Sequence, residues 1–295
     1  MRAPVTADAP AVLAVLAARN LADLGGSDYT LEDLRDEWRG LDLELERDVQ
    51  VVETQGGRIV AYAVVRSFGS MVAVAPEHEG RGIGSQLLEW VQQRERERGS
   101  DAHRQWVAAT NAAARALLSE AGYRLIRSNW RMARRLAQVE PAPAVPPGYH
   151  LRAVNPVGDA RALHAVDADA FAGADDYVPE SLAEFSQEHL GAHNFDPAVS
   201  RAATRAGRVV GFLLARRWRE EAVGFIDILA VHPDHQGHGL GATLLRSAFA
   251  AFAAEGLREA QLGVSSGNAR GLRLYEQSGM TVRHRADIYE RPVGS

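Results

Sequence analysis

A glycine-rich loop with the chemistry of a phosphate site occurs twice in this chain. The two copies read Glu79-Gly80-Arg81-Gly82-Ile83-Gly84 and Gln236-Gly237-His238-Gly239-Leu240-Gly241, and each follows a Val-x-Pro segment. This order predicts a strand, a sharp turn and a helix whose first N–H groups and dipole attract an anion. Glycine suits the turn because it adopts positive φ and lets a pyrophosphate approach the backbone.

A carboxylate interrupts the apolar run that precedes the second loop. Asp227 lies within Phe225-Ile226-Asp227-Ile228-Leu229-Ala230-Val231. Burying an unpaired carboxylate is costly, so Asp227 needs either a structural partner or a functional role. Strand side chains alternate between faces, which predicts that Asp227 shares a face with Val231, four residues further on.

Three histidines at every third position, His232, His235 and His238, raise the alternative of a metal site. They lie on the loop that is expected to bind phosphate, and no carboxylate or thiolate stands at a metal-binding spacing from them. We therefore expect no metal, and we place His238 near the phosphate.

The loops belong to a longer internal repeat. Glu79 and Gln236, Asn111 and Asn268, and Gly122 and Gly279 are all 157 positions apart, whereas Gly57 and Gly207 are 150 apart. The repeat spans nearly all of both halves, and the seven extra residues of the second half fall near 216–223. A longer hairpin between two strands is the simplest explanation.

The composition limits the classes of protein to which this chain can belong. The 295 residues suffice for two domains, and 46% hydrophobic with 24% charged residues is ordinary for a globular chain. No apolar stretch approaches the roughly 20 residues of a membrane span. The absence of cysteine excludes disulfides, thiolate metal sites and acyl-cysteine intermediates, and with no signal-peptide pattern we expect a cytoplasmic protein.

Charge argues against a nucleic-acid partner. The formal net charge is −5, and the arginines at 124, 127, 131, 134 and 135 are more typical of a solvated face than of a nucleic-acid site. Whether the chain is a monomer or a homodimer stays open.

The predicted organisation is two domains, 1–138 and 149–295, joined by a proline-rich linker, 139–148. Each half should form an α+β domain with a mostly antiparallel sheet. In the second half we expect strands near 209–216, 222–231 and 259–264, helices over 240–255 and 268–278, and a final hairpin to Tyr289. An alternation of strands and helices typical of a Rossmann fold is not present.

The second half resembles the GNAT N-acetyltransferase superfamily. Its loop fits the family pattern Gln/Arg-x-x-Gly-x-Gly/Ala from Gln236 to Gly241, and Asn268, Tyr275, Glu276 and Gly279 fit a downstream Asn-x6-Tyr-Glu-x2-Gly motif. The resemblance implies two tandem GNAT domains, each a mixed, mostly antiparallel sheet flanked by helices. It also implies transfer of an acetyl group from acetyl-CoA to an amine.

The resemblance assigns roles to these residues. The backbone at Leu229 and Val231 would pair with the pantetheine arm of acetyl-CoA, the N–H groups of Gly237 to Gly241 would hold its pyrophosphate, and Asn268 would meet the pantetheine. Asn268 is equally suited to cap a helix. Tyr275 matches the general acid at the sulfur, and Asp227 lies where family members carry a base or a substrate anchor. Asp176 and Tyr177 fall in a loop that shapes the acceptor pocket, although a structural turn is at least as good an explanation.

The first half departs from the motif. Glu79 stands in place of Gln236, Leu118 in place of Tyr275, and, by counting back from Val74, Ser70 in place of Asp227. We predict that this half is non-catalytic, whether it still holds CoA or only braces its neighbour.

As a tandem GNAT chain of this size, the sequence resembles the mycothiol synthase group, whose enzymes acetylate a small thiol precursor. The carboxylate that the group places six residues before the strand-end valine is Phe225 here. We therefore expect a broader acetyl-CoA-dependent N-acetyltransferase that acts on the primary amine of a small molecule by direct attack. The alternatives are a peptide or protein N-terminal acetyltransferase and a non-catalytic CoA-binding regulatory module.

Overall fold

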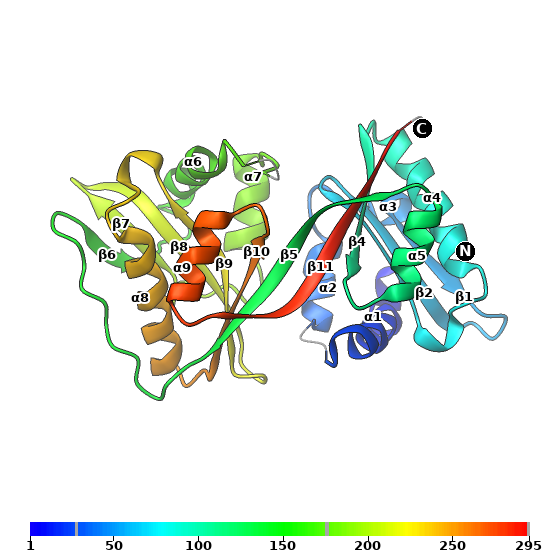
Figure 1. Ribbon diagram of the computed structural model, residues 1–295, viewed down its shortest axis with the longest axis horizontal. Helices are drawn as coiled ribbons and strands as arrows, with labels where there is room; N and C mark the ends of the chain where they lie inside the picture. The colour runs from blue at the N-terminus through cyan, green and yellow to red at the C-terminus, as the bar shows by residue number, and fades with distance from the viewer. Residues whose placement is uncertain (27–28, 175–176, 294–295) are drawn as a thin grey trace. The chain divides into compact units, whose positions relative to one another are not determined.

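The computed structural model describes residues 1–26, 29–174 and 177–293. They form two compact units, Met1–Asn129 with His284–Ser295 and Trp130–Arg283. Each unit is an α+β fold with helices on both faces of a sheet (Figure 1). In the described part of the chain, no helix is long and apolar enough to cross a membrane.

The first unit has the strand order β1-β2-β3-β4-β11. Neighbouring strands are antiparallel except for β3 and β4, which are parallel. Its elements are α1 (Ala9–Leu24), α2 (Leu31–Trp38), α3 (Leu45–Asp48), β1 (Val49–Glu53), β2 (Ile59–Arg66), β3 (Gly69–Val74), α4 (Ile83–Glu97), β4 (Ala102–Ala108), α5 (Ala112–Glu120) and most of β11 (Thr281–Pro292), with the 3-10 turns η1 (Thr6–Asp8) and η2 (Pro76–His78).

The second unit repeats this plan with the order β10-β9-β8-β7-β6, and only β9 and β10 are parallel. Its elements are β6 (His150–Ala153), α6 (Ala160–Phe171), α7 (Leu182–Phe185), the π-turn η3 (Ser186–Leu190), β7 (Arg201–Arg205), β8 (Arg208–Trp218), β9 (Val223–Val231), η4 (Pro233–His235), α8 (Leu240–Ala254), β10 (Glu259–Ser265) and α9 (Ala269–Gln277). Strand β5 (Arg124–Arg135) runs from the first unit into the second.

Alternation along the central strands builds two core layers in each unit. On β8, Phe212 and Leu214 pack with α6 and α7, whereas Leu213 and Ala215 pack with α8. All four side chains are fully buried because both faces of the strand are covered. The mixed, mostly antiparallel fold and the duplication predicted from the sequence are confirmed, and the seven extra residues do lengthen the β8–β9 hairpin.

The compact units do not end where the repeat suggested. Met132, predicted to close the first domain, is fully buried in the core of the second unit, beside Phe249. Ile288 and Tyr289, predicted to close the second domain, are buried in the first unit, where β11 pairs with β4 from Ala286↔Ala108 to Pro292↔Ala102. The predicted boundaries at 138 and 149 are corrected accordingly, and the expected final hairpin is the single strand β11.

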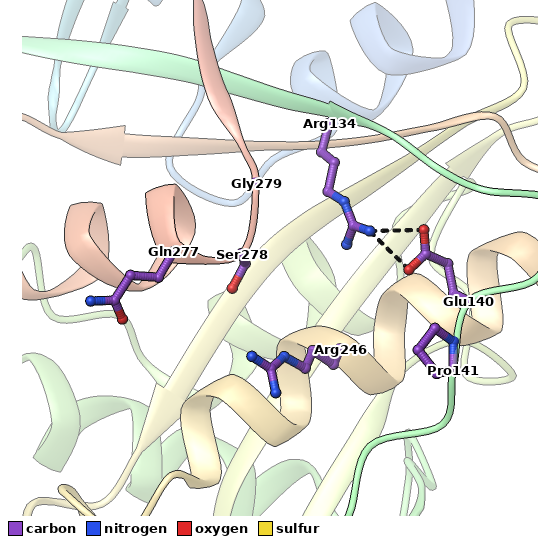
Figure 2. Close-up of a pocket in the computed structure, with 7 residues that line it drawn as sticks. All are labelled: Arg134, Glu140, Pro141, Arg246, Gln277, Ser278 and Gly279. Carbon is purple, nitrogen blue, oxygen red and sulfur yellow. Dashed lines mark hydrogen bonds and ion pairs between the residues drawn. The ribbon is translucent and has the colours of Figure 1, made fainter.

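The linker is fastened to the second unit at Glu140, although most of its residues are exposed. The backbone N–H of Leu136 donates to the carbonyl of Arg258, and Arg134 forms two hydrogen bonds of 2.9 Å with the carboxylate of Glu140 (Figure 2). The guanidinium of Arg134 also lies 4.6 Å from the centre of the Phe249 ring. These contacts hold the segment around Glu140 against α8.

Candidate active site

The site begins where β9 and β10 separate. Their parallel pairing runs from Glu259↔Val223 to Leu262↔Ile226 and then stops, although β9 continues to Val231. The N–H of His232 donates to Val210 on the β8 side, so the peptide groups of Val231 and Leu229 face the opposite edge. An extended ligand can pair with this edge as an added strand.

The second glycine loop lies at the end of this edge and opens the 15-residue helix α8. Gly237 and Gly239 have φ of +81° and +80°, and a Cβ added at either would have no neighbour within 4 Å. Their backbones thus present an open surface to an anion. A Cβ at Gly241 would instead lie 3.4 Å from Leu274, and the Leu240 side chain is buried in the core. Those two residues fix the helix against its neighbours.

Gln236 and Asn268 hold the loop in place. The Gln236 amide donates to the carbonyl of Val231 at 2.8 Å, and its oxygen accepts a hydrogen bond from Arg270 in the first turn of α9. The Asn268 oxygen accepts from the Gly271 N–H at 2.7 Å. The helix-cap role of Asn268 is therefore confirmed, and Gln236 ties β9 to α9.

Asp227 occupies a β-bulge. Leu214 pairs with Ile228 and Ala215 with Ile226, which leaves Asp227 as the extra residue of β9. The bulge breaks the alternation of side chains. Leu229 and Val231 pack on the α8 face, whereas the carboxylate of Asp227 lies 2.7 Å from His189 Nδ1 of η3. The prediction that Asp227 shares the face of Val231 is wrong for this reason.

Two cations hold the Asp227 carboxylate. Arg216 on β8 donates to it at 3.0 Å, and His189 is the second cation. The other ring nitrogen of His189, Nε2, lies 3.3 Å from Glu180. Burial would raise the pKa of Asp227, but Arg216 and then His189 lower that pKa well below its usual value. Burial would likewise lower the pKa of His189, but Asp227 and Glu180 raise it to about 10. At neutral pH the pair is carboxylate and imidazolium.

Tyr275 lies on the other side of the sheet. It is only 8% exposed, in the core cluster that contains Leu240 and Leu262, and burial raises its pKa to about 12. The phenol is therefore protonated at neutral pH and can donate a proton. Tyr275 and Asp227 therefore belong to opposite faces of the sheet.

A second polar group borders the loop after α6. The hydroxyl of Tyr177 hydrogen-bonds to Asp167, and its ring stacks on Phe171 with centroids 6.0 Å apart. Burial raises the pKa of Asp167 to about 6. Tyr177 thus has a structural partner, and Asp176 lies outside the described residues.

Sequence reasoning missed His189, Arg216 and Glu180. Arg216 could have been found from the register of the β8–β9 hairpin, which pairs it with Phe225 at the start of the apolar run. His189 lies 38 positions from Asp227, on a short helical segment whose docking has no local signal.

The three histidines of the loop have separate partners. His232 lies 3.4 Å from Asp169, His235 Nδ1 lies 3.1 Å from the Tyr149 hydroxyl, and His238 Nδ1 lies 2.9 Å from the carbonyl of Gln236. Within the described residues, no three His, Asp or Glu side chains converge as a metal site would require.

A pocket of about 380 Å³ near Arg134 contains none of the predicted site residues. It lies between α8 and the end of α9, where Gln277, Ser278 and Gly279 form one wall (Figure 2). Glu140 already neutralises Arg134 at this pocket.

Known proteins share this architecture. The chain is 28% identical to a GCN5-related N-acetyltransferase from Sphaerobacter thermophilus, whose crystal structure matches with a TM-score of 0.80 over 99% of this chain and 94% of that one. A tandem GNAT protein from the clavulanic acid biosynthesis pathway has the same fold, with a TM-score of 0.77, 18% identity, and coverage of 100% and 98%.

Curated relatives agree with the structures. The chain is 32% identical to a mycothiol acetyltransferase of Streptomyces avermitilis, over 96% of this chain and 91% of the relative, and 33% identical to one of Thermobispora bispora, over 75% and 74%. The model of the acetyltransferase (GNAT) family matches residues 19–123 and 164–280. On this evidence the chain belongs to the GNAT family and is an N-acetyltransferase with two tandem GNAT folds.

Proposed function

We propose that the second unit transfers the acetyl group of acetyl-CoA to the primary amine of a small molecule, by direct attack within a ternary complex. One observation carries this proposal. The open glycine loop at the start of α8 and the unpaired edge of β9 lead directly to the bulge that holds Asp227.

The residues present fit acetyl-CoA as the donor. The N–H groups from Gly237 to Gly241 would hold the pyrophosphate, and the peptide groups of Val231 and Leu229 would pair with the pantetheine arm. From Val231 to Asp227 the strand covers about 13 Å at its usual rise per residue. An arm extended along this edge would bring its thioester to the bulge, while Asn268 would lie beside the arm at the start of α9.

The reaction needs an amine nucleophile and a proton for the departing thiolate. The acceptor enters as an ammonium and first loses one proton to solvent. The neutral nitrogen then attacks the acetyl carbon, the new C–N bond forms and the C–S bond breaks, and the second proton that the nitrogen loses balances the one that the sulfur gains. Tyr275 would donate the proton to the sulfur. Asp227 would orient the protonated amine before attack, because a carboxylate with so low a pKa is a poor base.

We further propose that the first unit does not catalyse this reaction. Leu118, 5% exposed, stands where the second unit has Tyr275, so the first unit lacks that proton donor. Its β2–β3 pairing has a regular register, so the first unit also lacks the bulge that holds Asp227.

The names of the curated relatives favour a small thiol-bearing amine as acceptor. The test uses the full chain with acetyl-CoA and two panels, small primary amines that include cysteinyl amines and peptides with free N-termini. We expect CoA release with a small amine. Turnover with peptides alone would support the peptide acetyltransferase, and CoA binding without turnover on either panel would support the regulatory module.

Tyr275→Phe tests the assignment of the acid. We expect at least about a 10-fold fall in kcat with unchanged acetyl-CoA affinity. Tyr123→Phe, which alters a buried tyrosine of the first unit, is the matched control and should keep its rate. An unchanged rate in Tyr275→Phe would remove Tyr275 from the mechanism.

A further inference from the structure

A histidine separates the two open glycines of the second loop, and its two ring nitrogens are not equivalent. His238 lies between Gly237 and Gly239, and its side chain is exposed. Its Nδ1 lies 2.9 Å from the carbonyl oxygen of Gln236. A carbonyl oxygen can only accept a hydrogen bond, so Nδ1 carries a proton and donates it. In the neutral ring, Nε2 is therefore an acceptor.

The Nε2 atom of His238 changes its hydrogen-bonding character with the charge of the ring. It makes no hydrogen bond or ion pair with the residues that the structure describes. A neutral ring presents a lone pair at Nε2, which repels a phosphate oxygen. A protonated ring presents an N–H group and a positive charge, which attract that oxygen. Only the protonated form of His238 can thus donate to a phosphate through this nitrogen.

The neighbouring His235 has the opposite arrangement. The Tyr149 oxygen accepts a hydrogen bond from Arg205 at 3.2 Å, so the Tyr149 hydroxyl donates its own proton to His235 Nδ1, which lies 3.1 Å away. Burial, and then the charges of Arg205 and His232, lower the pKa of His235. His235 is therefore held as a neutral ring with its proton on Nε2, and it needs no added proton to donate.

Other charged or titratable groups surround this part of the loop. They are His232, Asp234 and His235 in and before η4, Asp169 of α6, Arg205 of β7, Tyr149 before β6 and Arg270 of α9. The two carboxylates lie 3.4 and 3.8 Å from His232, which therefore has partners of its own. The two arginines stay charged and do not titrate near neutral pH. This leaves His238 as the group that can take up a proton when an anion binds.

We propose that binding of acetyl-CoA at this loop is coupled to protonation of His238, whose Nε2 then donates to the pyrophosphate. The inference rests on the proposed function, because it takes the second loop as the phosphate site. Donor affinity then falls as the pH rises from about 6 to 8, the range in which histidine loses its charge. The first loop carries Arg81, a permanent cation, at the corresponding position 157 residues earlier. His238→Arg should therefore remove the dependence on pH.

The test measures binding of CoA and dephospho-CoA to the full chain by isothermal titration calorimetry, in buffers of different ionisation enthalpy. Dephospho-CoA keeps the pyrophosphate and lacks the phosphate monoester that itself titrates near pH 6. For both ligands, the Kd of the wild type should rise about 5-fold more between pH 6 and 8 than the Kd of His238→Arg. The wild type should also take up more protons on binding. His235→Gln is the matched control and should keep the wild-type dependence.

The outcomes separate this inference from the proposed function. Equal pH dependence in the wild type and His238→Arg, with CoA bound and acetyl transfer intact, would overturn the role of His238 alone. A dependence that appears with CoA but not with dephospho-CoA would overturn the contact with the pyrophosphate. A wild-type chain that binds no CoA at any pH would overturn the proposed function and this inference together. Thermal unfolding of each variant shows whether it has folded.

Discussion

The two units differ most at the point where their parallel strands begin to separate. In the second unit, Ile226, Phe252 and Ala260 form an apolar cluster. The corresponding residues of the first unit are Ser70, Glu95 and His103, all buried, with Glu95 hydrogen-bonded to Ser70 at 2.5 Å and lying 2.8 Å from His103 Nδ1. Duplication has thus kept the sheet and changed the chemistry at its centre.

Strand pairing also changes the alignment of the two units. Ser70 pairs with Gln105 as Ile226 pairs with Leu262, so Ser70 corresponds to Ile226 and not to Asp227. Asp227 is an added residue with no counterpart in the first unit. The capacity to place a carboxylate at this opening therefore depends on one inserted residue, together with the histidine and arginine that hold it.

The largest effect should come from removing β11. A chain that ends at Arg283 loses Asp287, Ile288 and Tyr289, which are buried in the first unit. We expect the first unit to unfold, because the edge of β4 and the core beneath it become exposed. Hydrogen exchange would show lost protection in β1 to β4. Deleting 139–148 is not an equivalent control, since that segment packs on the second unit, so the control is a chain that ends at Val293. Retained protection in the shorter chain would contradict the assignment of β11 to the first unit.

The next largest effect should come from the same glycine-to-valine change in each loop, and it should differ between the two units. Both Gly82 and Gly239 have φ near +80°, where valine is strained. Gly239→Val should raise the KM for acetyl-CoA by about 100-fold, because strain and bulk displace the loop, equivalent to about 2.7 kcal/mol. Gly82→Val should leave steady-state turnover near the wild-type value. Equal losses in both variants would mean that both units contribute to catalysis.

The Asp227→Asn variant should show whether Asp227 anchors the acceptor amine or acts as a general base. If the carboxylate orients a cationic amine, the KM for the acceptor rises by about 10-fold while the KM for acetyl-CoA is unchanged. Ser70→Ala in the first unit serves as the matched control for altering a polar residue beside the strand opening. A fall in kcat alone, with a shifted pH profile, would instead identify Asp227 as the base.

A final effect concerns the pH dependence of stability, not the rate. Burial raises the pKa of Glu95 to about 7, above its unfolded value of 4.5. Folding therefore favours the protonated acid, and its contribution is fully present below pH 4.5 and is lost as the pH rises through 7. Glu95→Gln removes this dependence. The difference in unfolding free energy between variant and wild type should grow by up to about 3 kcal/mol from pH 4.5 to 7.5, as measured by denaturant titration. A constant difference across that range would show that Glu95 does not titrate on folding.

Local patterns were enough to predict the loop and the helix that follows it. Glycines at 237 and 239, an apolar residue at 240 and an asparagine before α9 each act through neighbours within a few residues, so their roles follow from sequence. The bulge could not be predicted, since an extra residue in a strand is visible only in its pairing with β8. The partners of Asp227 come from β8 and η3, and only tertiary packing brings η3 to it.

The predicted boundaries of the two units differ from the observed ones for a related reason. Residues 130–135 and 287–292 are 157 positions apart and occupy corresponding positions in the repeat, and repetition alone places each in its own half. Strand pairing is not set by the repeat. Met132 is buried with α8, and Ile288 is buried in the first unit.

Because β4 pairs with β11, the first sheet can be completed only late in synthesis of the chain. Ala102 pairs with Pro292, 190 positions later, so the ribosome must make almost the whole protein before the first sheet can close. Until then β4 offers an open edge, and unpaired edges recruit other strands. Closing so long a loop is also slow. Nascent chains of this protein should therefore depend on chaperones for longer than the early position of their first unit suggests.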